Sequence, residues 1–435
     1  MQSSMTKASL PLPFPSADAA RMTREAKGVV IAAVIGNGLI FYDFTVYSFS
    51  AVIIGKLYFP SSSPLSSLLM ALATFGAGFV MRPLGALLIG NLADRKGRKA
   101  ALTASITLMT LGTGMIAFTP SYASVGATAS LLIVLARLLQ GLAAGGEIGA
   151  ASAMLMELAN RGRRCYLVSW RAASQGASAL GGAMVGALAT ALFSPATLLA
   201  WGWRVPFVLG LSVGVVGWYI RRRMVEVPAT ARPRARLKEV FMQHPRALWY
   251  GILSMAAPSA SIYVMVFYMP TYQVTTLHQS PTISLLSACL AGVVIFVGSP
   301  TMALIADRQP RLKPIQCLTL ATSIALVYPA FLALTHGAGE LLSLLIIGGY
   351  AAVALTNGGA SAVMIMEAFP HHHRATGMSF IYSLGVAVFG GFAPFIVTWL
   401  IGVTANPMAP AWYLLTLLCI SLFATIRFPE ATHDR

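Results

Sequence analysis

Residues 90–99 read GNLADRKGRK, a short polar segment with a long apolar run on either side. Asp94 lies near a predicted helix end, where its carboxylate can pair with an arginine of the same loop or of a facing helix. Such a pair would stabilise one conformation of a gate, that is, of a contact that opens and closes one end of the protein. The alternative is that these charges only orient the chain in a membrane, but orientation requires neither the glycines nor the aspartate. We therefore interpret Gly90, Asp94, Arg95, Gly97 and Arg98 as gating residues.

The composition of the chain excludes a soluble protein. Its 435 residues are 57% hydrophobic and only 10% charged, whereas soluble domains carry roughly 25% charged residues. The same percentages exclude a disordered chain, which needs low hydrophobicity and high charge. The remaining class is an all-α integral membrane protein, with the lipid bilayer as its solvent.

Basic residues outnumber acidic ones, with 30 Lys and Arg against 13 Asp and Glu. Most of them fall in loops on one side of the apolar runs, so the positive-inside rule accounts for them. We expect no nucleic-acid binding, because no aromatic and basic surface lies outside the apolar runs. The bias predicts a multi-pass membrane protein with both termini in the cytoplasm.

The sequence predicts twelve membrane-spanning helices, each needing about 20 mostly apolar residues. The candidate runs cover approximately 28–54, 66–92, 100–119, 128–158, 165–191, 204–220, 248–272, 283–306, 314–335, 341–368, 376–402 and 410–427. A polar stretch separates six runs from six. We expect a cytoplasmic tail over 1–27, a six-helix bundle over 28–220, a cytoplasmic central loop over 221–247, a second bundle over 248–427 and a tail over 428–435.

Pairs of similar motifs recur in the two halves. Asp307 and Arg308 follow the eighth run as Asp94 and Arg95 follow the second, and the Met-Glu pair that ends the fourth run recurs at the end of the tenth. Weak internal symmetry of this kind is typical of secondary transporters, whose site lies between the repeats near the membrane midplane. We add to the gating residues the charged side chains at these positions and in the next loop: Glu157, Asp307, Arg308, Glu367 and Arg374.

Several motifs resemble the metabolite:proton symporter family of the major facilitator superfamily. They are Gly36-Asn37 before Tyr42-Asp43-Phe44, Arg82-Pro83-Leu84-Gly85, Arg137-Leu138-Leu139-Gln140-Gly141 followed by Gly146-Glu147, and Gly202-Trp203-Arg204-Val205-Pro206-Phe207. The pattern is most similar to that of bacterial citrate and tricarballylate proton symporters. The resemblance implies two pseudo-symmetric six-helix bundles, a location in a bacterial inner (plasma) membrane and proton-driven uptake of a small organic acid. A glutamate common in the family three residues before the first aspartate is replaced by Ile40, so the resemblance does not set the proton stoichiometry.

Charged side chains inside predicted spans indicate function, because each costs several kcal/mol to bury in a bilayer. Asp43 and Arg137 fall at comparable depth on antiparallel helices. We predict that Asp43 carries the coupling proton and that Arg137 tunes it, since a neighbouring guanidinium favours the ionised carboxylate and burial favours the protonated one. A permanent structural ion pair is the alternative. Glu147 is either a second proton site or the partner of Arg82.

Arg171 is the most informative candidate for substrate binding, because the fork of five donors on an arginine fits a carboxylate. Facing a central cavity, it would require an anionic substrate; the alternative is that it reaches the cytoplasmic boundary or pairs with Glu147. The remaining candidates are polar side chains on apolar helices, although tyrosines are also common at membrane interfaces. They are Asn37, Tyr42, Arg82, Gln175, Tyr272, Asn357 and Tyr382.

The sequence favours a transporter over other functional classes. It contains no Walker loop and no converging catalytic group, so we expect neither an enzyme nor ATP as the energy source. The four cysteines show no metal spacing, and three adjacent histidines at 371–373 have no Cys or carboxylate cluster to complete a site. We predict a monomer without metal or cofactor, driven by the proton gradient. The alternatives are a symporter for a dicarboxylate, shikimate or a betaine, a proton-antiport drug exporter, and a nutrient sensor.

Overall fold

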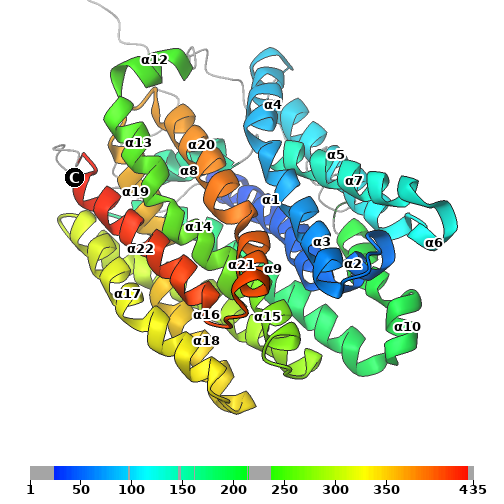
Figure 1. Ribbon diagram of the computed structural model, residues 1–435. Coiled ribbons are helices and arrows are strands. Elements are labelled where there is room, and N and C mark those ends of the chain that lie inside the picture. The colour runs from blue at the N-terminus through cyan, green and yellow to red at the C-terminus, as the bar shows by residue number, and fades with distance from the viewer. Residues whose placement is uncertain are drawn as a thin grey trace, which may run out of the picture.

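The computed structural model describes residues 24–96, 98–145, 148–160, 162–212, 214 and 237–429, and every regular element in these ranges is helical. Figure 1 shows the helices of the first half gathered on one side and those of the second half on the other. The first half contains α1 (Arg24–Phe49), α2 (Ala51–Tyr58), α3 (Pro64–Val80), α4 (Arg82–Lys96), α5 (Arg98–Phe118), α6 (Tyr122–Val125), α7 (Ala127–Gly145), α8 (Ile148–Leu158), α9 (Arg164–Leu192), α10 (Pro195–Ala200) and η1 (Gly202–Arg204).

The second half of the described chain begins at α12, inside the predicted central loop. Its elements are α12 (Leu237–Gln243), α13 (Pro245–Ser254), α14 (Ala256–Ile262), η2 (Tyr263–Tyr268), α15 (Met269–Thr275), α16 (Pro281–Asp307), α17 (Lys313–Thr335), α18 (Glu340–Ala354), α19 (Gly358–Glu367), α20 (Arg374–Gly385), η3 (Val386–Gly391), α21 (Ala393–Thr404) and α22 (Ala409–Arg427). The bundle limits predicted from the sequence remain predictions.

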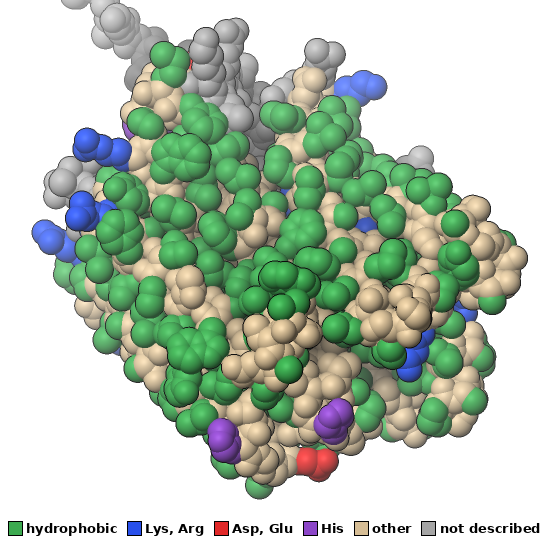
Figure 2. All heavy atoms as spheres, viewed as in Figure 1, with side chains coloured by type: hydrophobic (Ala, Val, Ile, Leu, Met, Phe, Trp, Pro, Cys, Tyr) green, Lys and Arg blue, Asp and Glu red, His purple; other side chains and the backbone are tan. Residues whose placement is uncertain are grey.

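Ten helices of the described ranges are long and apolar enough to cross a membrane, and the bent pair α1 and α2 adds an eleventh. This pair turns by 64° at Ser50, so the first predicted span is not one straight helix. Most of the predicted span over 204–220 lies outside the described residues, although 205–212 are helical. Large apolar side chains such as Leu87 and Leu131 point outward, and Figure 2 shows hydrophobic side chains over most of one face. A lipid-facing surface explains this exposure.

The two halves meet most extensively where α9 packs along α16. Two glycines allow this close approach. A Cβ atom on Gly176 would lie 2.6 Å from the backbone nitrogen of Phe296, and one on Gly292 would lie 2.7 Å from that of Leu180. Small residues let membrane helices pack backbone to backbone. This contact places the inward face of α9 against the second bundle.

Candidate functional site

A chain of hydrogen bonds joins Asp43 to Arg137 inside the first bundle. The Thr113 hydroxyl on α5 donates to Asp43 Oδ2 at 2.5 Å and accepts from Gln140 Nε2 at 3.0 Å. Gln140 Oε1 in turn accepts from Arg137 Nη1 at 2.7 Å. Asp43 is 6% exposed, and the other three side chains are buried as well. The Asp43 carboxylate and the Arg137 guanidinium are therefore linked through two neutral side chains rather than by direct contact.

Aromatic rings surround the two buried arginines of the first bundle. The Arg137 guanidinium carbon lies 4.5 Å from the ring centre of Tyr47 and 4.6 Å from that of Phe44. Arg82 lies 4.2 Å above the Phe79 ring. Cation–π contacts of this kind compensate part of the cost of removing a guanidinium from water. The aromatic rings therefore supply favourable contacts to two guanidinium groups that are fully buried.

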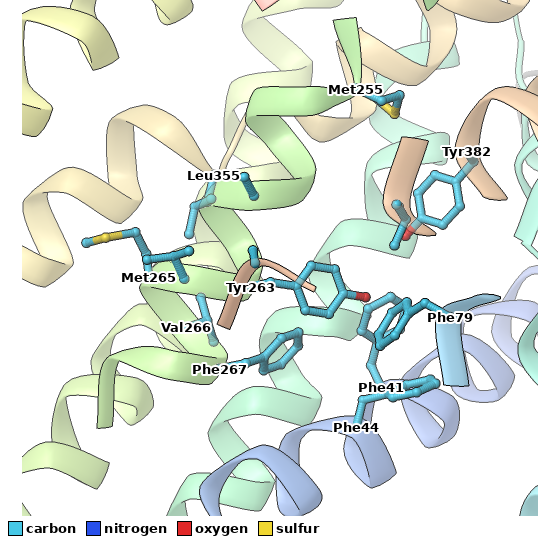
Figure 3. Packing of buried hydrophobic residues seen from close by; sticks show 14 of the residues in the cluster. Phe41, Phe44, Phe79, Met255, Tyr263, Met265, Val266, Phe267, Leu355 and Tyr382 are labelled. Atoms are coloured by element: carbon cyan, nitrogen blue, oxygen red, sulfur yellow. The ribbon is translucent and has the colours of Figure 1, made fainter. Parts of the chain in front are cut away.

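Tyr263 of the second bundle packs against this aromatic cluster of the first bundle. Its ring packs edge-to-face on Phe79 at 5.0 Å, and Figure 3 shows its hydroxyl turned toward Phe79. Tyr263 interacts electrostatically with Arg82 and with Tyr382. Tyr263 thus contacts both the buried Arg82 of the first bundle and the central cavity, which it lines.

A cavity of about 90 Å³, lined by both apolar and polar residues, lies between α9 and the second bundle. Arg171 is the one charged side chain among the described residues that line it. It is 7% exposed, it lies 5.0 Å from the Tyr382 ring centre, and its Nε and Nη1 atoms have no hydrogen-bond partner among the described residues. The other polar lining residues are Gln175, Ser259, Ser261, Tyr263, Gln316, Thr319, Ser323, Asn357, Ser361 and Tyr382. An arginine facing such a wall has the chemistry to bind an anion.

Irregular helical turns border the cavity on the side of the second bundle. The helical path breaks between α18 and α19, so that Asn357 lies at the start of a new helix. The π-helical turns η2 and η3 begin at Tyr263 and Val386, which both line the cavity. Broken and π-helical turns occur often at functional sites. Apolar run length alone could not reveal them.

Contacts between the bundles close the end that carries the basic loops. Asp307 at the end of α16 accepts hydrogen bonds from the backbone nitrogens of Cys165, at 2.8 Å, and Tyr166, at 2.9 Å. Arg164 Nη1 lies 3.3 Å from Glu367 Oε1. Together these contacts hold the first turn of α9 to the second bundle.

Further gating candidates lie around this contact. Glu157 lies 3.7 Å from His371 on the loop before α20, and both side chains are about half exposed. Arg374 donates to the Phe369 carbonyl and interacts electrostatically with Glu157 and Glu367. Arg308 is exposed beside Asp307.

The sequence profile of the Major Facilitator Superfamily matches residues 33–394 of the chain. The chain belongs to this superfamily. It is 33% identical over 414 residues to a citrate-proton symporter of Klebsiella pneumoniae, with 93% of each chain covered. It is 30% identical to a proline/betaine transporter of Salmonella typhimurium, with 93% of this chain and 83% of the relative covered, and 31% identical to the alpha-ketoglutarate permease of Escherichia coli, with 92% and 93% covered.

Solved structures of the superfamily share the fold. The partially occluded inward-open form of the Escherichia coli xylose transporter matches with a TM-score of 0.78 and 17% identity, covering 95% of this chain and all of that one. The expected fold, two six-helix bundles of the major facilitator type, is confirmed. The chain is a multi-pass membrane transporter and not an enzyme.

Not every substrate candidate lies at the cavity. Asn37 donates from Nδ2 to the Arg171 carbonyl and to the Ser174 hydroxyl, so it ties α1 to α9. The Tyr42 hydroxyl donates to the Pro206 carbonyl, and the Tyr272 hydroxyl donates to the Pro407 carbonyl. None of these three side chains lines the cavity. Of the eight candidates, Arg171, Gln175, Asn357 and Tyr382 do.

Part of the predicted gate and proton site cannot be placed. Glu147 and Gly97 lie outside the described residues, as do the side chains of Asp94, Arg95 and Arg98; Gly90 lies within α4. The sequence interpretation in turn missed Thr113, Gln140 and Gln316. Each is a polar side chain inside an apolar run, which is the signal that could have identified it.

Proposed function

We propose that this superfamily member is a proton-coupled symporter that imports a small organic acid anion, citrate or a related tricarboxylate, by alternating access. The observation that carries the proposal is Arg171, a buried guanidinium at the cavity between the bundles, two of whose nitrogens have no hydrogen-bond partner among the described residues. A buried charge without a partner is costly, and an anionic ligand would supply the partner. The 33% identity to a citrate-proton symporter supports the same substrate class.

Asp43 is the proposed proton carrier. Its carboxylate is buried and accepts the Thr113 hydroxyl, so the relay through Gln140 senses the state of Arg137. Protonation would remove the charge of Asp43, and one carboxylate of the anion would pair with Arg171, so that both of these buried charges are compensated when the bundles close. Rocking of the bundles would release both ligands on the other side.

The proline/betaine relatives favour a second candidate, a zwitterion with a carboxylate. Arg171 suits the carboxylate of either substrate class. A quaternary ammonium would need a free aromatic face. Of the two aromatic residues among the described lining, Tyr382 packs against Arg171 and Tyr263 packs against Phe79. The cavity therefore favours a polycarboxylate over a betaine.

The membrane and its orientation complete the proposal. We place the protein in a bacterial inner membrane as a monomer, with both termini in the cytoplasm, because the basic loops lie on one side. The closed gate of Asp307, Arg164 and Glu367 would then face the cytoplasm.

Uptake of labelled citrate into proteoliposomes, with and without an inward proton gradient, tests the function. The parent should accumulate citrate only with the gradient. Arg171→Gln should lose uptake, whereas Arg311→Gln, which changes an exposed loop arginine, should not. Asp43→Asn should lose accumulation but keep citrate exchange across the membrane. No citrate uptake by correctly folded parent protein, or uptake inhibited by glycine betaine in preference to citrate, would reject the tricarboxylate assignment.

A further inference from the structure

Asn357, at the start of α19, lines the cavity and carries a buried hydrogen-bond acceptor. Asn357 is 5% exposed and occupies the position before the first residue of α19. Its Nδ2 donates to Gln316 Oε1 at 2.7 Å, which turns the side chain away from the helix that it could cap. Its Oδ1 is buried with no partner among the described residues. A buried acceptor without a donor costs free energy that a bound ligand can recover.

The facing wall on α9 has the opposite chemistry. The buried side-chain atoms of this wall that lack a partner among the described residues are donors, namely Nε and Nη1 of Arg171 and Nε2 of Gln175. The two walls lie close together, since a Cβ atom on Gly358 would stand 3.4 Å from that of Ala172. A ligand bridging them must present an anion to α9 and a donor to α19.

We infer that Asn357 is the specificity-determining residue for a hydroxy acid, with Oδ1 accepting the hydroxyl of the ligand while Arg171 binds a carboxylate. The inference rests on the proposed import of organic acid anions and narrows the substrate class. A second carboxylate on the hydroxyl-bearing carbon would lie beside the first turn of α19, where Ser361 Oγ is buried and unpartnered and the helix dipole favours negative charge. Citrate and malate carry this group, whereas tricarballylate and succinate have the same carboxylates without the hydroxyl.

The test compares two pairs of acids that differ only in the hydroxyl: citrate with tricarballylate, and malate with succinate. Concentrations that half-inhibit uptake of labelled citrate are measured in proteoliposomes. Where uptake of citrate is absent, binding of each acid to the purified protein is measured instead. In the parent, the hydroxy acid of at least one pair should be favoured by about ten-fold or more, because the analogue leaves Asn357 Oδ1 unpaired.

The variant Asn357→Ala should reduce this ratio to about one by weakening the hydroxy acid. Gln273→Ala is the matched control, since Gln273 is a buried amide of the same bundle that bonds Gln279 and Ser287 away from the cavity; it should keep the parent ratio. A parent ratio that Asn357→Ala leaves unchanged would refute the inference, and where Asn357→Ala does not fold, a parent ratio near one would refute it. Equal affinities in both pairs refute the role of Asn357 alone. Uptake and binding of none of the four acids refute both this inference and the proposed function.

Discussion

Replacing Asp307 with asparagine should open the gate at the predicted cytoplasmic end. Asp307 belongs to the second bundle, yet both carboxylate oxygens accept backbone N–H groups at the start of α9, at 2.8 and 2.9 Å. These are groups that a helix cannot satisfy internally. Asparagine keeps one acceptor oxygen but loses the second oxygen and the negative charge. The substitution therefore weakens a contact that joins the two bundles at this end.

The size of the effect follows from known contributions of helix caps. A side-chain acceptor at a helix N-terminus contributes about 0.5–2 kcal/mol, and a negative charge there adds about 0.3–1 kcal/mol. Losing the charge and one of the two hydrogen bonds should cost the closed state about 1.4 kcal/mol. This corresponds to about a ten-fold shift toward the open state.

Cys165 supplies a built-in reporter of the gate. Its thiol belongs to the same first turn of α9 and is buried in the closed state. With Cys289, Cys317 and Cys419 replaced by serine, a membrane-impermeant maleimide should label Cys165 in inside-out vesicles about ten-fold faster in Asp307→Asn, because labelling follows the open population. Glu340→Gln removes an exposed acid at the start of α18 and should leave the rate unchanged. An unaltered labelling rate in Asp307→Asn would show that this contact does not hold the gate.

Three further predictions concern the bundle contact, the gate and the proton relay. Gly176→Leu should stop transport and lower the melting temperature by several degrees, because overpacking a tight contact costs about 1–3 kcal/mol; thermal unfolding and citrate uptake measure this. Arg164→Glu should speed labelling of the gate cysteine about three-fold, as expected for a partly exposed ion pair worth roughly 0.5–1 kcal/mol, and Glu367→Arg in the same chain should restore the parent rate. Thr113→Val should reduce gradient-driven uptake about ten-fold, the cost of leaving the Asp43 carboxylate without its hydrogen bond, whereas Thr107→Val on the exposed face of α5 should have no effect.

The general architecture could be predicted from the sequence because it depends on run length and charge, which are local. Apolar runs of spanning length and an excess of basic residues in alternate loops can be recognised in the sequence without knowledge of the three-dimensional structure. The breaks within the spans could not be predicted this way. The bend after Phe49 and the helix start at Asn357 lie inside apolar runs, and the packing of neighbouring helices determines where each path turns.

The candidate site was predictable in its charges but not in their partners. Asp43 and Arg137 could be placed at similar depth by counting residues along two antiparallel helices. The two side chains that join them lie on α5 and α7, and their inward orientation depends on how these helices pack. For Arg171 the sequence left two orientations open, and its contact with Tyr382 on a distant helix selects the cavity. The hydroxyls of Tyr42 and Tyr272 donate to the carbonyls of Pro206 and Pro407, and no spacing rule indicates these partners.

The division of polar groups between the bundles explains how one solute and one proton could be coupled. The buried cations and the buried acid described here lie in the first bundle, at Asp43, Arg82, Arg137 and Arg171, whereas the described cavity lining of the second bundle is neutral. Binding an anion at Arg171 cancels one positive charge, and this makes a proton on Asp43 less costly. By linkage the proton must favour the anion to the same extent. The second bundle then needs to contact only the uncharged groups of the solute. The amide of Asn357 can therefore set specificity without disturbing the charge balance that drives the cycle.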